Sequence, residues 1–251
     1  MSKKIALVTG ATSGIGHATA ELLLSNNYQV IITGRREDRL KEFQSRYPQN
    51  DVYTLNFDIR NEESVLNALN SLPDVWKNID VLVNNAGLAL GLSQFYDGNT
   101  EHWDTMIDTN VKGLLYISRA VSRGMKDRKS GHIVNIGSIA GKEVYNNGNV
   151  YCATKHAVDA LTKAMRLELA AFGVKVTGIH PGAVETEFSI VRFEGDEHRA
   201  KTVYQGFENL VAADIADAVY YAISRPAHVN INDLVIMPTA QPQAGLIHRN
   251  N

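Results

Sequence analysis

The stretch that decides the fold is KIALVTGATSGIG, residues 4–16. Its first half is a short apolar run, typical of a strand that is buried on both faces of a sheet. Its second half places Gly10, Gly14 and Gly16 between that strand and a helical pattern. A glycine-rich turn at the start of a helix lets backbone N–H groups and the helix dipole face a phosphate. The spacing G-x-x-x-G-x-G differs from the common dinucleotide fingerprint, so a turn that only packs helix on strand stays open.

Apolar runs of the same kind recur along the chain, with helical patterns between them. They lie at 28–34, 51–57, 79–85, 131–137, 174–180 and 232–238. Strands that alternate with helices predict a parallel sheet with right-handed crossovers. We therefore expect an α/β fold in one domain over 1–251, with a seven-stranded, doubly wound parallel sheet and helices on both faces. About 183–210 is expected to be a substrate loop, and about 239–251 a C-terminal tail.

The composition excludes several classes of protein. The 251 residues carry a formal net charge of -2, with 44% hydrophobic and 21% charged residues, so nothing favours nucleic acid or a membrane surface as partner. No apolar run approaches the roughly 18 residues that a membrane span needs. The single cysteine, Cys152, excludes an internal disulfide and suits a reducing compartment, so we expect a cytoplasmic protein. The eight histidines show no paired metal-ligand spacing, and no metal is expected.

The segment GNVYCATKHA, residues 148–157, pairs a tyrosine with a lysine. Tyr151 and Lys155 are one helical turn apart, so they share a face of the predicted helix. A nearby positive charge lowers the pKa of a phenol from its usual value of about 10. The pair therefore suits general acid–base chemistry near neutral pH. The same spacing occurs by chance in many helices, so it does not decide the function alone.

Four motifs occur in one order: TGATSGIG, NNAG at 84–87, NIGS ending at Ser138, and Y-x-x-x-K. Together they resemble the classical short-chain dehydrogenase/reductase family from about residue 4 to 240. The resemblance implies a Rossmann fold, an NAD(P) cofactor and the catalytic residues Asn110, Ser138, Tyr151 and Lys155. In the family, the tyrosine transfers a proton and the lysine lowers the tyrosine pKa and binds the nicotinamide ribose. The serine positions the carbonyl oxygen, and the asparagine holds a water through its helix backbone.

The end of the second apolar run indicates which nicotinamide cofactor binds. Arg35 and Arg36 stand where an acidic residue would bind the adenosine ribose, and arginine there accommodates a 2′-phosphate. We therefore predict NADP(H), although both arginines could merely be solvated. The cofactor residues that the motifs and the resemblance imply are Gly10, Thr12, Ser13, Gly14, Ile15, Gly16, Arg35, Arg36, Asp58, Asn85, Ala86, Gly87, Tyr151, Lys155, Pro181, Gly182, Val184 and Thr186.

Segments that extend beyond these motifs, such as NNAGLALG, TEFSIVRFEGD and AGLIHR, resemble the NADP-dependent 3-hydroxy acid dehydrogenase subfamily. The resemblance implies oxidation of serine, L-allo-threonine or a 3-hydroxypropionate-type acid to the 3-oxo acid or semialdehyde. It also implies a homotetramer whose tail crosses a subunit interface.

The substrate would contact Ser138, Tyr151 and Arg192, the last of these as a carboxylate clamp or else as an interface or surface residue. Glu185 and Glu187 would repel an anion, so we expect them to face outward. Two alternatives remain: a carbonyl reductase for uncharged ketones or diketones, and a non-catalytic NADP(H)-binding regulator, which predicts an incomplete catalytic tetrad.

Overall fold

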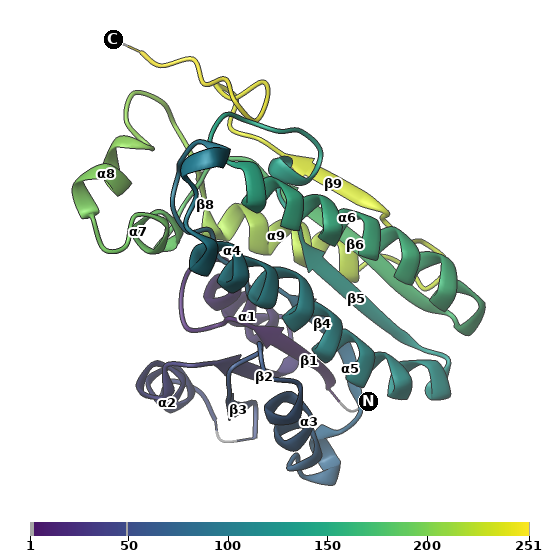
Figure 1. The fold of residues 1–251 in the computed structure, drawn as a ribbon. Helices are drawn as coiled ribbons and strands as arrows, with labels where there is room; N and C mark the ends of the chain where they lie inside the picture. Colours follow the sequence, from purple (N-terminus) through teal and green to yellow (C-terminus); the bar gives the residue numbers. More distant parts are fainter. Residues whose placement is uncertain (1–2, 49, 251) are drawn as a thin grey trace.

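A seven-stranded parallel sheet forms the centre of the molecule in a computed structural model that describes residues 3–48 and 50–250 (Figure 1). Its strands are β1 (Lys4–Thr9), β2 (Tyr28–Gly34), β3 (Val52–Asn56), β4 (Ile79–Asn84), β5 (Gly131–Ile136), β6 (Val174–Pro181) and β9 (Asp233–Ile236). They are ordered β3-β2-β1-β4-β5-β6-β9 and every pairing is parallel. The expected strands are confirmed. The order reverses between β1 and β4, the switch point where open sheets of this kind bind ligands.

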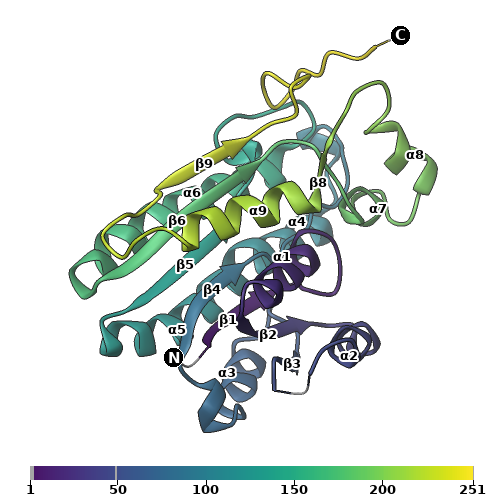
Figure 2. The same cartoon turned by 180° about the vertical axis from the view of Figure 1, so that it is seen from behind.

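Helices cover both faces of the sheet (Figures 1 and 2). One face carries α1 (Gly14–Ser25), α2 (Glu37–Ser45) and α9 (Ala212–Ile223); the other carries α3 (Glu62–Asn70), α5 (Leu114–Arg128) and α6 (Asn149–Leu169). Alternate strand residues point to opposite faces, so Ala6 and Val8 pack with the first group while Ile5 and Leu7 pack with the second. Two apolar cores result, which explains why the strand sequences are almost continuously apolar. Within the described residues, no helix has both the length and the apolarity to cross a membrane.

The helical pattern that follows Asn99 is not one regular helix. It divides into α4 (Thr100–Ile107), a π-helical segment (Asp108–Gly113) and α5. Such widened turns inside helices occur frequently at functional sites. Here the widened turn contains Asn110, which is buried. Short 3-10 helices at Asp74–Trp76, Phe95–Asp97, Ile139–Gly141 and Ala170–Phe172 complete the connections.

The predicted substrate loop has more structure than its sequence indicated. It contains β7 (Val184–Glu185), α7 (Phe188–Arg192) and α8 (Glu197–Thr202), and β7 pairs with β8 (Leu210–Val211). Both views place α7, α8 and the C-terminal tail at the end of the sheet where the strands terminate (Figures 1 and 2). The tail packs on this loop within the same chain, since the backbone N–H of Asn250 donates to the carbonyl of Gly206 at 2.6 Å.

Candidate active site

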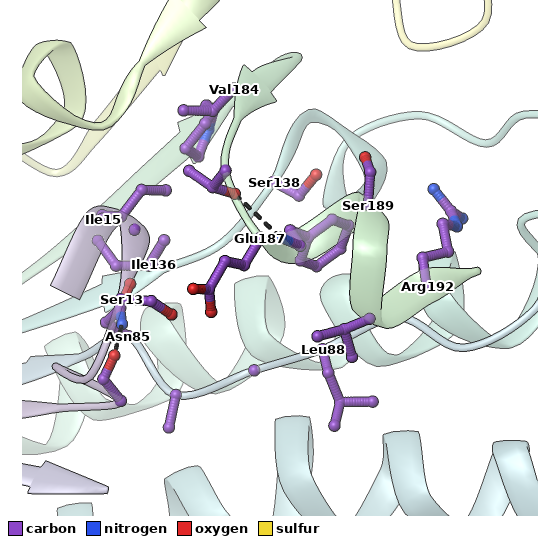
Figure 3. A pocket seen from close by; sticks show the side chains of 18 of the residues that line it. Ser13, Ile15, Asn85, Leu88, Ile136, Ser138, Val184, Glu187, Ser189 and Arg192 are labelled. Carbon is purple, nitrogen blue, oxygen red and sulfur yellow. Dashed lines mark hydrogen bonds between the residues drawn. The ribbon is translucent and has the colours of Figure 1, made fainter. Parts of the chain in front are cut away.

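A cavity of about 640 Å³ opens beside the carboxyl ends of the strands (Figure 3). Nearly all the predicted site residues line it. They are Gly10, Thr12, Ser13, Gly14, Ile15, Arg35, Arg36, Asp58, Asn85, Ala86, Gly87, Ser138, Tyr151, Lys155, Pro181, Gly182, Val184, Thr186 and Arg192. The two exceptions are Gly16 and Asn110, which lie behind the wall.

The glycine-rich turn has almost no room for side chains. Gly10 and Gly14 have φ of +66° and +56°, the left-handed region that favours glycine. A Cβ on Gly10 would lie 2.9 Å from the Cα of Ala86. A Cβ on Gly16 would lie 2.6 Å from the carbonyl oxygen of Gly10, so Gly16 packs α1 against the turn and does not face the cavity. The turn is therefore a narrow cradle of backbone atoms.

The N-terminus of α1, which is the positive end of its helix dipole, points at this cradle. The N-cap residue is Ser13, in an extended conformation, and its side chain makes no capping hydrogen bond to the described part of the helix. The first turn also contains no acidic residue. An uncapped helix N-terminus offers free N–H groups and a partial positive charge to an anion. This donor set fits the pyrophosphate of a dinucleotide.

Arg36 joins the cradle to the substrate loop. Its guanidinium donates to the hydroxyls of Thr12 and Ser13, each 2.9 Å from Nη2, and Nη1 lies 2.9 Å from the carboxylate of Glu187. The expectation that Glu187 faces outward was wrong: its carboxylate points into the cavity beside Ser13 (Figure 3). The reason is its pairing with Arg36, 151 residues earlier in the chain. Glu185 is exposed, as expected.

Asp58 lies just beyond β3 and lines the cavity. Its carboxylate pairs with Arg60 at 2.6 Å. That hydrogen bond holds the pKa of Asp58 below its usual value, with a smaller contribution from the charge of Arg35. Asp58 is therefore an ionised acceptor at the place where the family resemblance puts the adenine.

Three members of the predicted tetrad meet in the cavity. Ser138 lies two residues beyond β5, and its hydroxyl accepts a hydrogen bond from the N–H of Ala140 at 3.0 Å. Tyr151 and Lys155 project from the start of α6, and both are buried. The Lys155 ammonium donates to the carbonyl of Ile136 at 2.9 Å and lies 6.0 Å from the centre of the Tyr151 ring.

Asn110 stands directly behind this group. Its amide bonds both backbone groups of Leu88 at 2.8 Å and donates to the hydroxyl of Thr154 at 3.0 Å. A Cβ on Gly87 would lie 3.2 Å from the Asn110 oxygen and 3.6 Å from the Lys155 nitrogen. Since its side chain is fully engaged, Asn110 holds the segment after β4 in place.

The pKa of Tyr151 differs from the expectation. Burial is the largest influence and raises the pKa of Tyr151 above its usual value; the nearby phenol of Tyr145 adds to the rise. The hydrogen bond to Ser138 and the charge of Arg192 act in the opposite direction. Burial also lowers the pKa of Lys155 to about 8. The groups that lower the pKa of Tyr151 are thus Ser138 and Arg192 rather than Lys155, and desolvation outweighs them.

Arg192, at the end of α7, lies on the cavity wall next to Tyr151. Its guanidinium carbon is 5.4 Å from the ring centre of Tyr151 and 5.5 Å from that of Tyr145. It donates to the Tyr145 hydroxyl at 2.5 Å and to the carbonyl of Gly91 at 3.4 Å. These contacts hold a cation in the cavity, across from Glu187 (Figure 3).

Sequence reasoning missed Tyr145, Phe188 and Gln241. Tyr145 positions Arg192, and the Phe188 ring lies 5.6 Å from the Tyr151 ring. Gln241 belongs to the tail, yet it is buried, lines the cavity and accepts from the N–H of Ala183 at 2.8 Å. Each acts through a partner distant in sequence, so no local pattern could have indicated these roles.

A second titratable cluster lies behind the site, where Asp159, His180 and Asp233 bring their ligand atoms within 4.8 Å of one another. Lys142 and Lys163 each lie 2.6 Å from an oxygen of Asp159, and Lys142 also lies 3.4 Å from Asp233. The carboxylates are therefore already paired with cations. The cluster is an ion-pair network that joins α6, β6 and β9.

Comparison with known proteins agrees with this geometry. Residues 4–197 match the family model for short chain dehydrogenase. The NADP-dependent 3-hydroxy acid dehydrogenase YdfG of Escherichia coli strain K12 is 48% identical over 247 residues, which cover 98% of this chain and 99% of that protein. Sulfoacetaldehyde reductase 2 of Chromohalobacter salexigens is 41% identical over 239 residues, 94% of this chain and 95% of that protein.

Solved structures give the same result. The closed form of serine dehydrogenase complexed with NADP+ superposes with a TM-score of 0.94 at 47% identity, covering 98% of this chain and 99% of that chain. ElxO with NADP bound superposes with a TM-score of 0.82 at 31% identity, covering 94% and 97%. The chain therefore belongs to the short-chain dehydrogenase family, as its four motifs predicted.

Proposed function

We propose that this protein interconverts a short 3-hydroxy acid and its 3-oxo acid or semialdehyde, with NADP(H) as cofactor. The oxidoreductase class and the cofactor follow from the family and from relatives that match over almost their whole length. The substrate class is the new element. The observation that carries it is the Arg192 guanidinium in the cavity wall, 5.4 Å from the ring centre of Tyr151.

The cavity would hold NADP(H) along its length. The glycine cradle and the N-terminus of α1 suit the pyrophosphate, and Arg36 with Thr12 and Ser13 suits the 2′-phosphate. Asp58 would bind the adenine, and Lys155 the nicotinamide ribose. When bound, the cofactor supplies or accepts the hydride.

Tyr151 would act as the general acid and base. In the reducing direction its hydroxyl donates a proton to the oxygen of the reacting carbonyl, and in the oxidising direction it removes the proton of the alcohol. Ser138, hydrogen-bonded to Tyr151, would hold that oxygen in place and stabilise its developing charge. Lys155 would replenish the proton from behind, next to the segment that Asn110 holds.

Arg192 would bind the carboxylate of the substrate. A guanidinium offers paired donors that match a carboxylate, and Tyr145 fixes its orientation. A carboxylate on Arg192 would leave the hydroxyl carbon of a short acid within reach of Tyr151. The names of two relatives agree with a small anionic substrate, since a 3-hydroxy acid carries a carboxylate and sulfoacetaldehyde a sulfonate.

The alternative enzyme, a carbonyl reductase for uncharged ketones, would have no use for a cation beside Tyr151. A non-catalytic regulator would not require the complete tetrad. From the subfamily resemblance we also infer a homotetramer, which light scattering on the purified protein tests. From the single cysteine and the composition we infer a cytoplasmic location.

The first experiment is the initial rate of NADP+ reduction with L-allo-threonine, with NAD+ in parallel and with Tyr151→Phe as control. Turnover with NADP+, little with NAD+ and a loss of about 10²- to 10⁴-fold in Tyr151→Phe are expected. Absence of turnover with both cofactors would refute the substrate class, and uncharged ketones with NADPH would be tried next.

A further inference from the structure

The contact between Arg36 and Glu187 joins two parts of the site that have separate tasks. Arg36 belongs to the adenosine side and stands at the N-cap of α2. Glu187 belongs to the substrate loop and is the N-cap residue of α7, the short helix that ends in Arg192. Nη1 of Arg36 and Oε2 of Glu187 are 2.9 Å apart.

The Glu187 carboxylate lies in an anion-binding group of side chains. Besides the guanidinium, the hydroxyl of Ser13 interacts with it, and the hydroxyl of Thr12 bonds the same arginine. Although burial opposes this, the hydrogen bonds to Arg36 and Ser13 keep the pKa of Glu187 below its usual value, so the group is ionised at neutral pH. One guanidinium and hydroxyl groups are also the donors that a phosphate monoester requires.

We propose that Glu187 is an internal competitor for the adenosine 2′-phosphate: in the free enzyme its carboxylate occupies the Arg36–Ser13 anion site and must leave when the phosphorylated cofactor binds. This inference rests on NADP(H) being the cofactor. Glu187 thereby weakens the binding of NADP(H) and leaves the binding of NAD(H) unaffected. It limits the preference for NADP(H) over NAD(H) that Arg36 creates.

The ion pair has the properties of a replaceable contact. The side chains of Arg36 and Glu187 are 44% and 41% exposed, so solvent screens the pair and its contribution is small. A 2′-phosphate carries up to two negative charges at neutral pH and cannot share the site with a carboxylate without repulsion. Glu187 is the N-cap residue of α7, but its side chain makes no capping hydrogen bond to that helix, so the carboxylate can leave Arg36 without loss of a helix contact.

The test measures binding and needs no turnover. Isothermal titration of the full chain gives the Kd of NADP+, NAD+, 2′,5′-ADP and 5′-ADP for the wild type, Glu187→Gln and the matched control Glu185→Gln. Glu185 is two residues away on the same loop, is exposed and bonds Asn209 rather than the cavity. Glu187→Gln is expected to lower the Kd of NADP+ and 2′,5′-ADP by about two- to fivefold, the range of an exposed ion pair, and to leave NAD+ and 5′-ADP unchanged. Glu185→Gln is expected to change none of them.

Two outcomes would overturn the inference. An equal gain for NAD+ and NADP+ would mean that the carboxylate acts only through its general charge. An unchanged or higher Kd for NADP+ would mean that Glu187 does not compete. If NADP(H) is not the cofactor, the result differs from both of these outcomes: the wild type itself would then bind NADP+ no better than NAD+. Melting curves of both variants check that the fold is intact.

Discussion

Replacing Arg192 by leucine tests the substrate assignment directly. The guanidinium is in the cavity, held by the Tyr145 hydroxyl at 2.5 Å and by the faces of two tyrosine rings. Leucine keeps an apolar group against these rings and removes the charge. If Arg192 binds the carboxylate, Arg192→Leu loses activity with acids and retains activity with neutral analogues.

The size of the loss follows from the chemistry of the contact. A hydrogen bond to a charged group contributes about 1.5–3 kcal/mol. With about 1.4 kcal/mol for each factor of ten, kcat/KM for L-allo-threonine should fall by about 10- to 150-fold. Loss of the charge also removes an influence that lowers the pKa of Tyr151. That second effect acts on every substrate, so the measured quantity must be a ratio.

The assay compares kcat/KM for L-allo-threonine with that for its carboxamide, which has the same shape and lacks the carboxylate charge. The ratio should fall in Arg192→Leu toward one. Arg199→Leu is the control, because Arg199 lies on the same loop, stacks on Phe193 at 4.4 Å and does not line the main cavity. An unchanged ratio in Arg192→Leu, or equal losses for acid and amide, would refute the clamp and favour the uncharged ketone alternative.

Three further predictions concern the acid–base group, the cofactor and the cradle. Because burial raises the pKa of Tyr151, the rate of alcohol oxidation should rise with pH through at least 8, whereas carbonyl reduction should stay nearly level there because the phenol keeps its proton. Lys155→Met removes a nearby positive charge and should move the oxidation profile to higher pH in stopped-flow or steady-state measurements. Arg36→Gln should raise the Kd of NADP+ by about 10- to 150-fold, the worth of a charged hydrogen bond, and leave that of NAD+ within about threefold. Gly16→Ala places a Cβ 2.6 Å from a backbone carbonyl oxygen and should cost about 1–3 kcal/mol of unfolding free energy in denaturant melts, whereas Gly124→Ala, whose Cβ meets only the end of a flexible arginine, should not.

The sheet and the tetrad were predictable because their signals are local. Each strand is predicted by its own apolar run. The ends of the predicted strands differ from the observed ends by at most two residues. The catalytic roles of Ser138, Tyr151 and Lys155 were inferred from the family resemblance, and their sequence positions at a strand end and a helix start agree with where they lie. Asn110 was also inferred from the resemblance, but the π-helical turn that contains it has no recognisable pattern in the sequence.

The walls of the cavity were predicted less well because they depend on distant partners. Glu187 was expected outside, since two acidic residues near an anionic substrate are unfavourable when only their neighbours are considered. In the fold the Glu187 carboxylate pairs with Arg36, 151 residues earlier in the chain, and this pairing stabilises the carboxylate inside the cavity. Gln241 is similar: a polar residue in a polar tail becomes buried because it satisfies the N–H of Ala183. Side chains that neutralise or satisfy a remote group are not visible as a sequence pattern.

The burial of Tyr151 and the charges around it decide whether its phenol is protonated before the substrate binds. Burial favours the neutral phenol of Tyr151 and lowers the pKa of Lys155 only to about 8, so at neutral pH the pair is a phenol beside an ammonium rather than a phenolate beside an ammonium. At neutral pH Tyr151 therefore keeps its proton, which is the form that carbonyl reduction requires. Oxidation requires the phenolate, and in this chain the groups that favour it are Ser138 and Arg192. A carboxylate bound to Arg192 would cancel part of that positive charge, so an acidic substrate itself strengthens the hold of Tyr151 on its proton. Measured with the acid and with its carboxamide, the pH at which oxidation reaches half its maximum should then be higher for the acid in the wild type, and Arg192→Leu should raise it for both substrates.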